Sequence, residues 1–166
     1  MNFFSKIFVL YSTFNKLKEK NMLKLGTAAP EFEAQDQNGI IHKLSYYKDK
    51  WVLLYFYPRD NTPGCTVEAC SLRDNYSDFK KIDAIILGVS TDSVSSHDKF
   101  VQKYNLPFTL LADSEKKIIK AYEAGGLFKR VSYLINPEGK IARVYEKVKP
   151  NEHASEVIRD LRALRK

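Results

Sequence analysis

The chain has 166 residues, and its composition, 44% hydrophobic and 28% charged, is typical of one globular domain and excludes a disordered chain. The formal net charge of +7 includes no Lys and Arg run with interleaved aromatic residues, so nucleic-acid binding is not expected. Two cysteines are too few for a disulfide-stapled secreted scaffold, which favours a reducing compartment such as the cytoplasm.

The first 21 residues form a basic extension with four lysines and one glutamate. Its apolar run over residues 3–11 is interrupted by Lys6 and is too short to span a membrane, so no stable membrane insertion is expected. We expect a mis-assigned start, with Met22 opening the natural domain. The alternatives are a targeting leader for an organelle and a membrane-surface helix. The folded domain is expected over residues 22–166.

Strand and helix signals alternate after this extension. The Asn38-Gly39 pair predicts a β-hairpin with a type I′ turn between residues 31–36 and 40–44. An apolar run over residues 51–57 predicts a central buried strand, and residues 66–81 predict a helix. Further strands are expected at residues 84–90, 109–112, 131–135 and 140–145, and further helices at residues 93–104, 115–122 and 151–164. This order predicts an α/β fold with an N-terminal β-hairpin and a mixed central sheet flanked by helices.

The segment Pro58-Arg-Asp-Asn-Thr62-Pro63-Gly-Cys65 places a cysteine in the first turn of a helix, directly after the central strand. Open α/β folds bind small ligands at that end of a strand, and a helix start favours a thiolate. Pro63 suits the first helical position, and the Thr62 hydroxyl is expected to cap the helix. A reactive Cys65 is the leading hypothesis, and a small buried core cysteine is the alternative.

The second cysteine, Cys70, follows with C-x4-C spacing rather than the C-x2-C of thioredoxin-like or zinc motifs. The three histidines are scattered singly, so a structural zinc site is not expected. Residues five apart in an intact helix have Cα atoms roughly 8–9 Å apart, whereas a disulfide needs about 7 Å or less. Bonding of Cys65 to Cys70 would therefore require the first helical turns to unwind. The alternative is that Cys70 packs inward as a small apolar residue.

These residues resemble a known family. The pattern Pro58-x3-Thr62-x2-Cys65 is similar to the peroxiredoxin active-site signature. The longer run FYPRDNTPGCTVEACSLRD, residues 56–74, is similar to the subfamily called bacterioferritin comigratory protein or peroxiredoxin Q. The resemblance covers about residues 23–164, includes the opening LGTAAPEF at residues 25–32, and implies a thioredoxin-like fold.

The resemblance implies a thiol peroxidase that works without metal, haem or flavin. Cys65 would attack the O–O bond of hydrogen peroxide or an alkyl hydroperoxide and become a sulfenic acid. Cys70 would condense with it to an intramolecular disulfide, which thioredoxin or a similar dithiol would reduce. Members of this subfamily are often monomers, and we expect a monomer here.

The resemblance also assigns three supporting residues. Pro58 would shield the pocket from water, Thr62 would hydrogen-bond the peroxide or the sulfur, and Arg130 would stabilise negative charge at the sulfur. The residues alone leave Arg59, Arg73 and Arg130 open for the last role. The sequence Arg-Val-Ser-Tyr at residues 130–133 fits the family's Arg-x-Thr/Ser-aromatic context, which favours Arg130.

Two other functions fit the same fold. A thiol–disulfide oxidoreductase would need C-x2-C at the helix start, where only Cys65 is present. A redox-sensing or holdase protein would use oxidation to unfold the helix. Thr62 and Arg130 discriminate between these functions, because a peroxidase needs both and an exchanger needs neither.

Overall fold

The computed structural model describes residues 22–126 and 129–166. The expectations for residues 1–21, a mis-assigned start or a leader, concern a segment outside the described residues. Within the described ranges, no helix has the length and apolar composition that crossing a membrane requires. The elements are β1 Glu33–Asp36, β2 Ile41–Lys43, the 3-10 helix Leu44–Tyr47, β3 Trp51–Phe56, α2 Pro63–Asp74, α3 Tyr76–Lys81, β4 Ala84–Ser90, α4 Val94–Tyr104, β5 Thr109–Ala112, α5 Lys117–Ala121, β6 Val131–Ile135, β7 Ile141–Tyr145 and α6 His153–Leu164.

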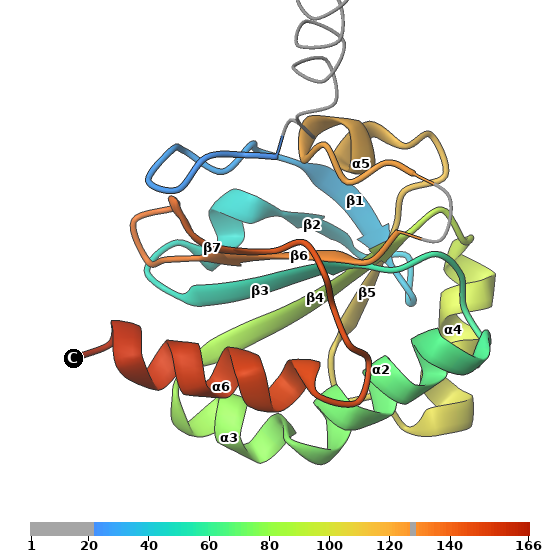
Figure 1. Ribbon diagram of the computed structural model, residues 1–166. Helices are drawn as coiled ribbons and strands as arrows, with labels where there is room; N and C mark the ends of the chain where they lie inside the picture. The colour runs from blue at the N-terminus through green and yellow to red at the C-terminus, as the bar shows by residue number, and fades with distance from the viewer. Residues whose placement is uncertain (1–21, 127–128) are drawn as a thin grey trace, which may run out of the picture.

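The described residues form one seven-stranded mixed sheet with the strand order β2-β1-β5-β4-β3-β6-β7 (Figure 1). Strands β3, β4 and β5 run parallel to one another, while β6 is antiparallel to β3 and β1 is antiparallel to β5. The parallel strands all end at the same edge of the sheet, where the loop from β3 to α2 begins. The predicted α/β class, with its N-terminal hairpin, is confirmed.

Both faces of β3 are buried. Leu53 and Tyr55 belong to a hydrophobic cluster that α2, α3, α4 and α6 cover on one face. Val52, Leu54 and Phe56 belong to a second cluster on the opposite face, which α5 covers. Because side chains alternate along a strand and both sets are enclosed, β3 is a rigid support for the loop that follows it.

The hairpin is present, but the predicted type I′ turn is wrong. A type I′ turn requires positive φ at both central residues, and in this loop only Gly39 has it, at 76°. The Gly39 amide donates to the Asp36 carbonyl, and the Asp36 carboxylate accepts from the amides of Asn38 and Ile40 at 2.8 and 2.9 Å. The side chain of Asp36 thereby organises a three-residue loop that contains a left-handed glycine. The Asn-Gly pattern predicts a two-residue turn instead, because it does not take the Asp36 side chain into account.

The helix predicted over residues 66–81 is divided in two at Asn75. This residue has φ −102° and ψ 8°, and its side-chain amide donates to the Ser71 carbonyl at 2.8 Å. An asparagine that bonds its own backbone competes with helix continuation, which is the reason for the break. The change of direction lets Leu72 in α2 and Phe79 in α3 both be fully buried, while Tyr76 is only partly buried.

The other boundaries agree closely with the sequence. The strands predicted at residues 84–90, 109–112 and 131–135 are confirmed, and α4 begins after a capping Ser93 whose hydroxyl accepts from the Ser96 amide. Helix α5 is shorter than predicted, and residue 44, expected to end a strand, instead begins a 3-10 helix.

Candidate active site

The site begins where β3 passes into α2. Thr62 is the N-cap residue and Pro63 is the first helical residue, as predicted. The predicted capping by the Thr62 hydroxyl is wrong, because this hydroxyl donates to the Arg59 carbonyl at 3.0 Å and makes no cap hydrogen bond. Asn61 adopts a left-handed conformation, φ 58°, within the turn that brings these two groups together. The amide of Cys65 lies among the first-turn N–H groups, which a helix leaves without intrahelical acceptors.

A buried cluster surrounds the sulfur of Cys65. Cys65 is 1% exposed, and the guanidinium Nη1 of Arg130 lies 3.2 Å from its Sγ. The same Nη1 donates to Glu68 Oε2 at 2.9 Å. One cation therefore contacts both the thiol and a carboxylate. The structure brings Arg130 to the sulfur from the start of β6, more than sixty residues along the chain.

The two other candidate arginines lie differently. Arg59 lines the same cleft as Arg130, without a hydrogen bond to the sulfur among the described contacts. Arg73 donates to the Tyr104 carbonyl at 2.7 Å and to Asp74 at 3.0 Å, so its charge is used in packing α2 against the end of α4.

Glu68 is a member of the site that the sequence reasoning missed. It is fully buried, and burial raises its pKa to about 7 although the neighbouring Arg130 lowers it. Its Oε1 has no hydrogen-bond partner. The available signal was spacing, since a side chain three residues after Cys65 lies on the same face of the helix. A charged residue on that face was a candidate neighbour of the sulfur.

An open cleft of about 840 Å³ lies above this cluster. Its lining includes Pro58, Thr62 and Arg130, three of the residues that the sequence assigned to the site. Gly125 and Gly126, in the loop between α5 and β6, also line the cleft. The apolar walls are formed by Phe56, Val89, Ile119 and Ala124. The cleft therefore combines a cationic end beside the sulfur with an apolar surface.

Cys70 is partly buried in α2 and is unbonded, as is Cys65. Both cysteines belong to one continuous helix, α2, which spans Pro63–Asp74. Their spacing of five residues places the Cα atoms roughly 8–9 Å apart in such a helix. Neither cysteine is among the residues that line the cleft, but Cys65 contacts Arg130, which does line it. The structure thus presents a reduced state in which the two sulfurs do not meet.

Gly64→Ala is expected to slow the reaction of Cys65 with peroxide by about tenfold or more while leaving stability nearly unchanged. A methyl group at Gly64 would lie 2.6 Å from Arg130 Nη2, so the guanidinium must move. The fold tolerates this, because the displaced group is the end of a flexible side chain. Stopped-flow oxidation and thermal unfolding would measure the two effects. The control is Gly125→Ala, whose methyl meets only Ile119 at 3.8 Å in the same cleft; equal rates for both variants would contradict the prediction.

Glu68→Gln is expected to change how stability depends on pH. The pKa of Glu68 rises from 4.5 to about 7 on folding, so the folded chain retains a proton that the unfolded chain loses. The contribution of Glu68 to the free energy of unfolding is therefore complete below about pH 4.5 and falls as pH rises to about 7, by ~3 kcal/mol. Urea unfolding of both proteins at about pH 5 and about pH 8 measures it. If the free energies of unfolding of the wild type and the variant differ by the same amount at both pH values, Glu68 does not titrate in this range.

Comparisons with known proteins show the family of this chain. The AhpC/TSA family model matches residues 25–144. Peroxiredoxin Bcp of Bacillus subtilis is 42% identical over 150 residues, covering 84% of this chain and 96% of its own length. Chloroplastic peroxiredoxin Q of Oryza sativa subsp. japonica is 41% identical over 145 residues, covering 84% of this chain and 67% of its own length.

A solved structure shares the fold. The bacterioferritin comigratory protein of Xanthomonas campestris, described in terms of alkyl peroxide reduction, superimposes with a TM-score of 0.81 at 32% identity, covering 87% of this chain and 98% of its own. This likeness confirms the thioredoxin-like peroxiredoxin fold. The chain belongs to the AhpC/TSA family of thiol peroxidases, within the Bcp and peroxiredoxin Q group. Relatives in this group come from bacteria and from chloroplasts.

Proposed function

We propose that this peroxidase reduces hydrogen peroxide and organic hydroperoxides with Cys65 as its nucleophile. The observation that carries the proposal is the contact of 3.2 Å between Arg130 Nη1 and Cys65 Sγ in the first turn of α2. A guanidinium and a helix start both favour a thiolate, and the thiolate is the nucleophilic form of cysteine. Thr62 and Pro58 line the cleft beside this contact.

The proposed peroxide step transfers one oxygen atom to sulfur. The Cys65 thiolate attacks the terminal oxygen of the hydroperoxide, an S–O bond forms and the O–O bond breaks. The electron pair of that bond leaves on the other oxygen, which takes up a proton and departs as water or an alcohol. In this proposal the Cys65 amide and the Thr62 hydroxyl hold the peroxide, and Arg130 stabilises the charge that develops. Cys65 is left as a sulfenic acid.

The proposed resolving step closes a disulfide inside the chain. The thiol of Cys70 attacks the sulfenic sulfur of Cys65, the S–S bond forms, and the oxygen leaves as water. The two residues are five positions apart in α2, so the first turns of this helix must unwind for the sulfurs to meet. A thioredoxin-type dithiol would then reduce the disulfide by exchange and restore the helix.

The cleft supports the inclusion of organic hydroperoxides. Its volume of about 840 Å³ is far larger than hydrogen peroxide requires, and Val89, Ile119 and Ala124 give it an apolar wall. The related Xanthomonas campestris protein is described in terms of alkyl peroxide reduction. We further propose that residues 22–166 form one functional domain and act as a monomer. The proposed location is a reducing compartment such as the cytoplasm, and an organelle is the alternative if residues 1–21 are a leader.

The test is the intact mass of the reduced protein after one equivalent of hydrogen peroxide. We expect a rapid loss of two hydrogen atoms, because Cys65 and Cys70 close a disulfide. A gain of one oxygen instead would contradict the resolving role of Cys70 while supporting a reactive Cys65. No rapid change would contradict the assignment of Cys65 and favour a protein that exchanges disulfides.

A further inference from the structure

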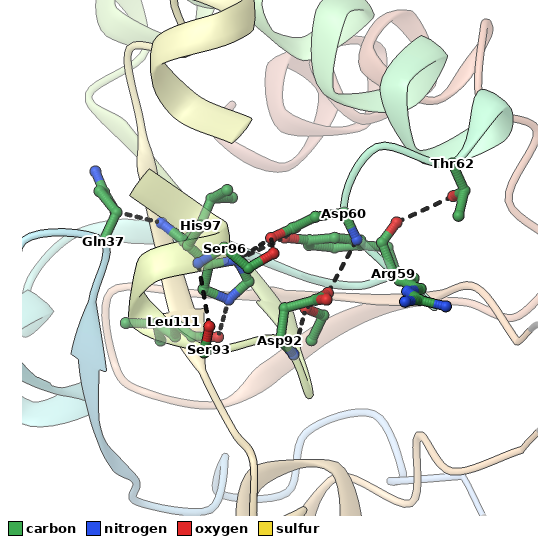
Figure 2. A network of polar contacts seen from close by, with 12 residues as sticks. Gln37, Arg59, Asp60, Thr62, Asp92, Ser93, Ser96, His97 and Leu111 are labelled. Atoms are coloured by element: carbon green, nitrogen blue, oxygen red, sulfur yellow. Dashed lines mark hydrogen bonds and ion pairs between the residues drawn. The ribbon is translucent and has the colours of Figure 1, made fainter. Parts of the chain in front are cut away.

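A second buried polar cluster lies beside the loop that joins β3 to α2. Its centre is a carboxylate–imidazole pair, in which Asp60 Oδ2 and His97 Nδ1 are 2.8 Å apart (Figure 2). Asp60 is 6% exposed and His97 is fully buried. Neither residue takes part in the chemistry proposed above, and neither was singled out from the sequence. A buried charged network at this place needs an explanation.

The hydrogen bonds of His97 define how many protons the pair holds. Its Nε2 faces the Leu111 carbonyl at 3.1 Å, and since a carbonyl only accepts, Nε2 carries a proton. The contact between Nδ1 and Asp60 Oδ2 must hold a second proton to be a hydrogen bond. Asp60 also accepts from the Tyr57 hydroxyl at 2.6 Å and from the Ser96 hydroxyl at 2.8 Å. The pair is therefore neutral overall and fully hydrogen-bonded, which makes its burial tolerable.

The cluster is a hydrogen-bond network rather than a metal site. Among the described residues, Asp60, Asp92 and His97 are the group whose ligand atoms lie close enough together for a metal, within 4.8 Å. Both ring nitrogens of His97 already have oxygen partners. Asp92 Oδ2 accepts from the Asp60 amide at 2.9 Å and from the Ser90 hydroxyl at 2.6 Å. A metal would have to break these bonds.

This network fastens the active-site loop to three other elements. The side chain of Asp60 is held by Ser96 and His97 of α4, and its amide is held by Asp92, which follows β4. His97 continues the connection to Leu111 of β5. All these partners lie more than thirty residues from Asp60, so the loop is positioned from outside its own sequence.

Asp60 lies between two residues that line the cleft. Pro58 and Thr62 are two residues before and two residues after Asp60, and both line the cleft. The Arg59 carbonyl next to Asp60 accepts the hydroxyl hydrogen of Thr62, as Figure 2 shows. Fixing Asp60 therefore fixes this carbonyl, and the carbonyl orients the Thr62 hydroxyl. Cys65 lies further on, within α2, and is held there by the helix itself.

We propose that the Asp60–His97 pair is a positioning device for the peroxide step, holding Thr62 and Pro58 where the peroxide binds. This inference rests on the proposed peroxidase function. It separates two properties of the site: the pair places the peroxide-binding loop, whereas Arg130 and the helix start govern the thiolate. Loss of the pair should therefore slow attack on a peroxide, which must be held in position, and should spare attack on a reagent that needs only a thiolate.

The test uses two histidine variants in a Cys70→Ser background, in which Cys65 is the single reactive cysteine. The amide of Gln in His97→Gln can replace Nε2 and keep the Leu111 contact, while Asp60 loses its imidazole partner and keeps only its hydroxyl donors. The amide of Asn in His97→Asn can replace Nδ1 and keep the Asp60 contact. Rates of Cys65 oxidation by hydrogen peroxide and of its alkylation by iodoacetamide are measured for each variant by quenched intact mass.

We expect His97→Gln to lower the peroxide rate by about tenfold or more and to leave the alkylation rate within about twofold of the Cys70→Ser parent. His97→Asn should recover most of the peroxide rate. Ser96→Ala removes one hydroxyl donor to Asp60 from the same helix and leaves the His97 contact in place, so it should show a smaller loss in the same direction and is not expected to affect folding. The matched control is His42→Asn, whose amide can replace Nδ1 but not Nε2 and therefore breaks a similar pair in the β1–β2 hairpin, His42 Nε2 to Asp36 Oδ2 at 2.9 Å. Both of its rates should be unchanged.

Three results would overturn the inference while the peroxidase function stands: equal peroxide rates in parent and His97→Gln, equal losses in the peroxide and alkylation rates, or equal peroxide losses in the Gln and Asn variants. The second would mean that the pair acts on the thiolate, and the third that His97 only fills space. A parent protein that is alkylated but does not react with peroxide would instead overturn the proposed function and this inference with it.

Discussion

Cys65→Ser is expected to abolish peroxide turnover, with a loss of about a thousandfold or more in rate. A serine hydroxyl does not ionise near neutral pH, so the attacking anion is lost although Arg130 and the helix start stay in place. Cys65 is 1% exposed, and replacement of sulfur by oxygen changes little in volume, so the fold should persist. The measurement is hydrogen peroxide consumption coupled to thioredoxin and thioredoxin reductase, with thermal unfolding as a check on folding.

A Cys65→Ser protein that still consumed peroxide would assign the nucleophile to Cys70, the other cysteine of the chain. The double variant Cys65→Ser, Cys70→Ser is the control for that outcome. It should show no more peroxide loss than buffer with the reductant alone. Because alkyl hydroperoxides would enter the same cleft and meet the same sulfur, tert-butyl hydroperoxide should give the same ranking of variants.

Cys70→Ser is expected to reduce about one equivalent of peroxide per chain and then to stop in the presence of thioredoxin. The sulfenic acid on Cys65 forms normally in this variant, but no second thiol in the chain can convert it into the disulfide that thioredoxin recognises. The measurement is the burst of peroxide loss followed by the steady-state rate. A small dithiol such as dithiothreitol, which can reduce a sulfenic acid directly, should restore part of the turnover.

Sustained thioredoxin-dependent turnover by Cys70→Ser would remove Cys70 from the cycle. It would also remove the reason for α2 to unwind, because Cys65 would then be reduced without an intramolecular disulfide. The wild-type protein provides the matching structural test. Its α2 amides should exchange with solvent faster after oxidation than before, since helical geometry does not allow residues five apart to bond.

The two buried clusters beside the loop suggest different contributions to one reaction. Arg130 contacts both the sulfur and Glu68, while His97 bonds to Asp60 in the loop that carries Thr62. The guanidinium of Arg130 contacts both the Cys65 sulfur and the Glu68 carboxyl, whose pKa is raised to about 7. Substitutions in the first cluster should therefore alter alkylation and peroxide reduction together, whereas substitutions in the second should alter peroxide reduction alone.

Local patterns predicted much of this fold. The strands at residues 84–90, 109–112 and 131–135 were predicted at their observed bounds, because each is a short apolar run between turn residues. The errors also have local causes. Asn75 breaks a helix by bonding to Ser71, and Asp36 organises the hairpin loop through its carboxylate. Side-chain hydrogen bonds of this kind are not visible in hydrophobic periodicity.

The sequence by itself determined the placement of Cys65 at a helix start, because this follows from adjacent residues: an apolar strand, then Thr62, Pro63 and Cys65. Its resemblance to a family pointed to Arg130. Only the tertiary structure decided that Arg130 contacts Cys65 and Glu68 together, and that His97 holds Asp60. The physical reason is that these contacts join residues from 37 to 65 positions apart in the sequence. The packing of α2, α4 and β6 around one sheet brings such residues together and buries them.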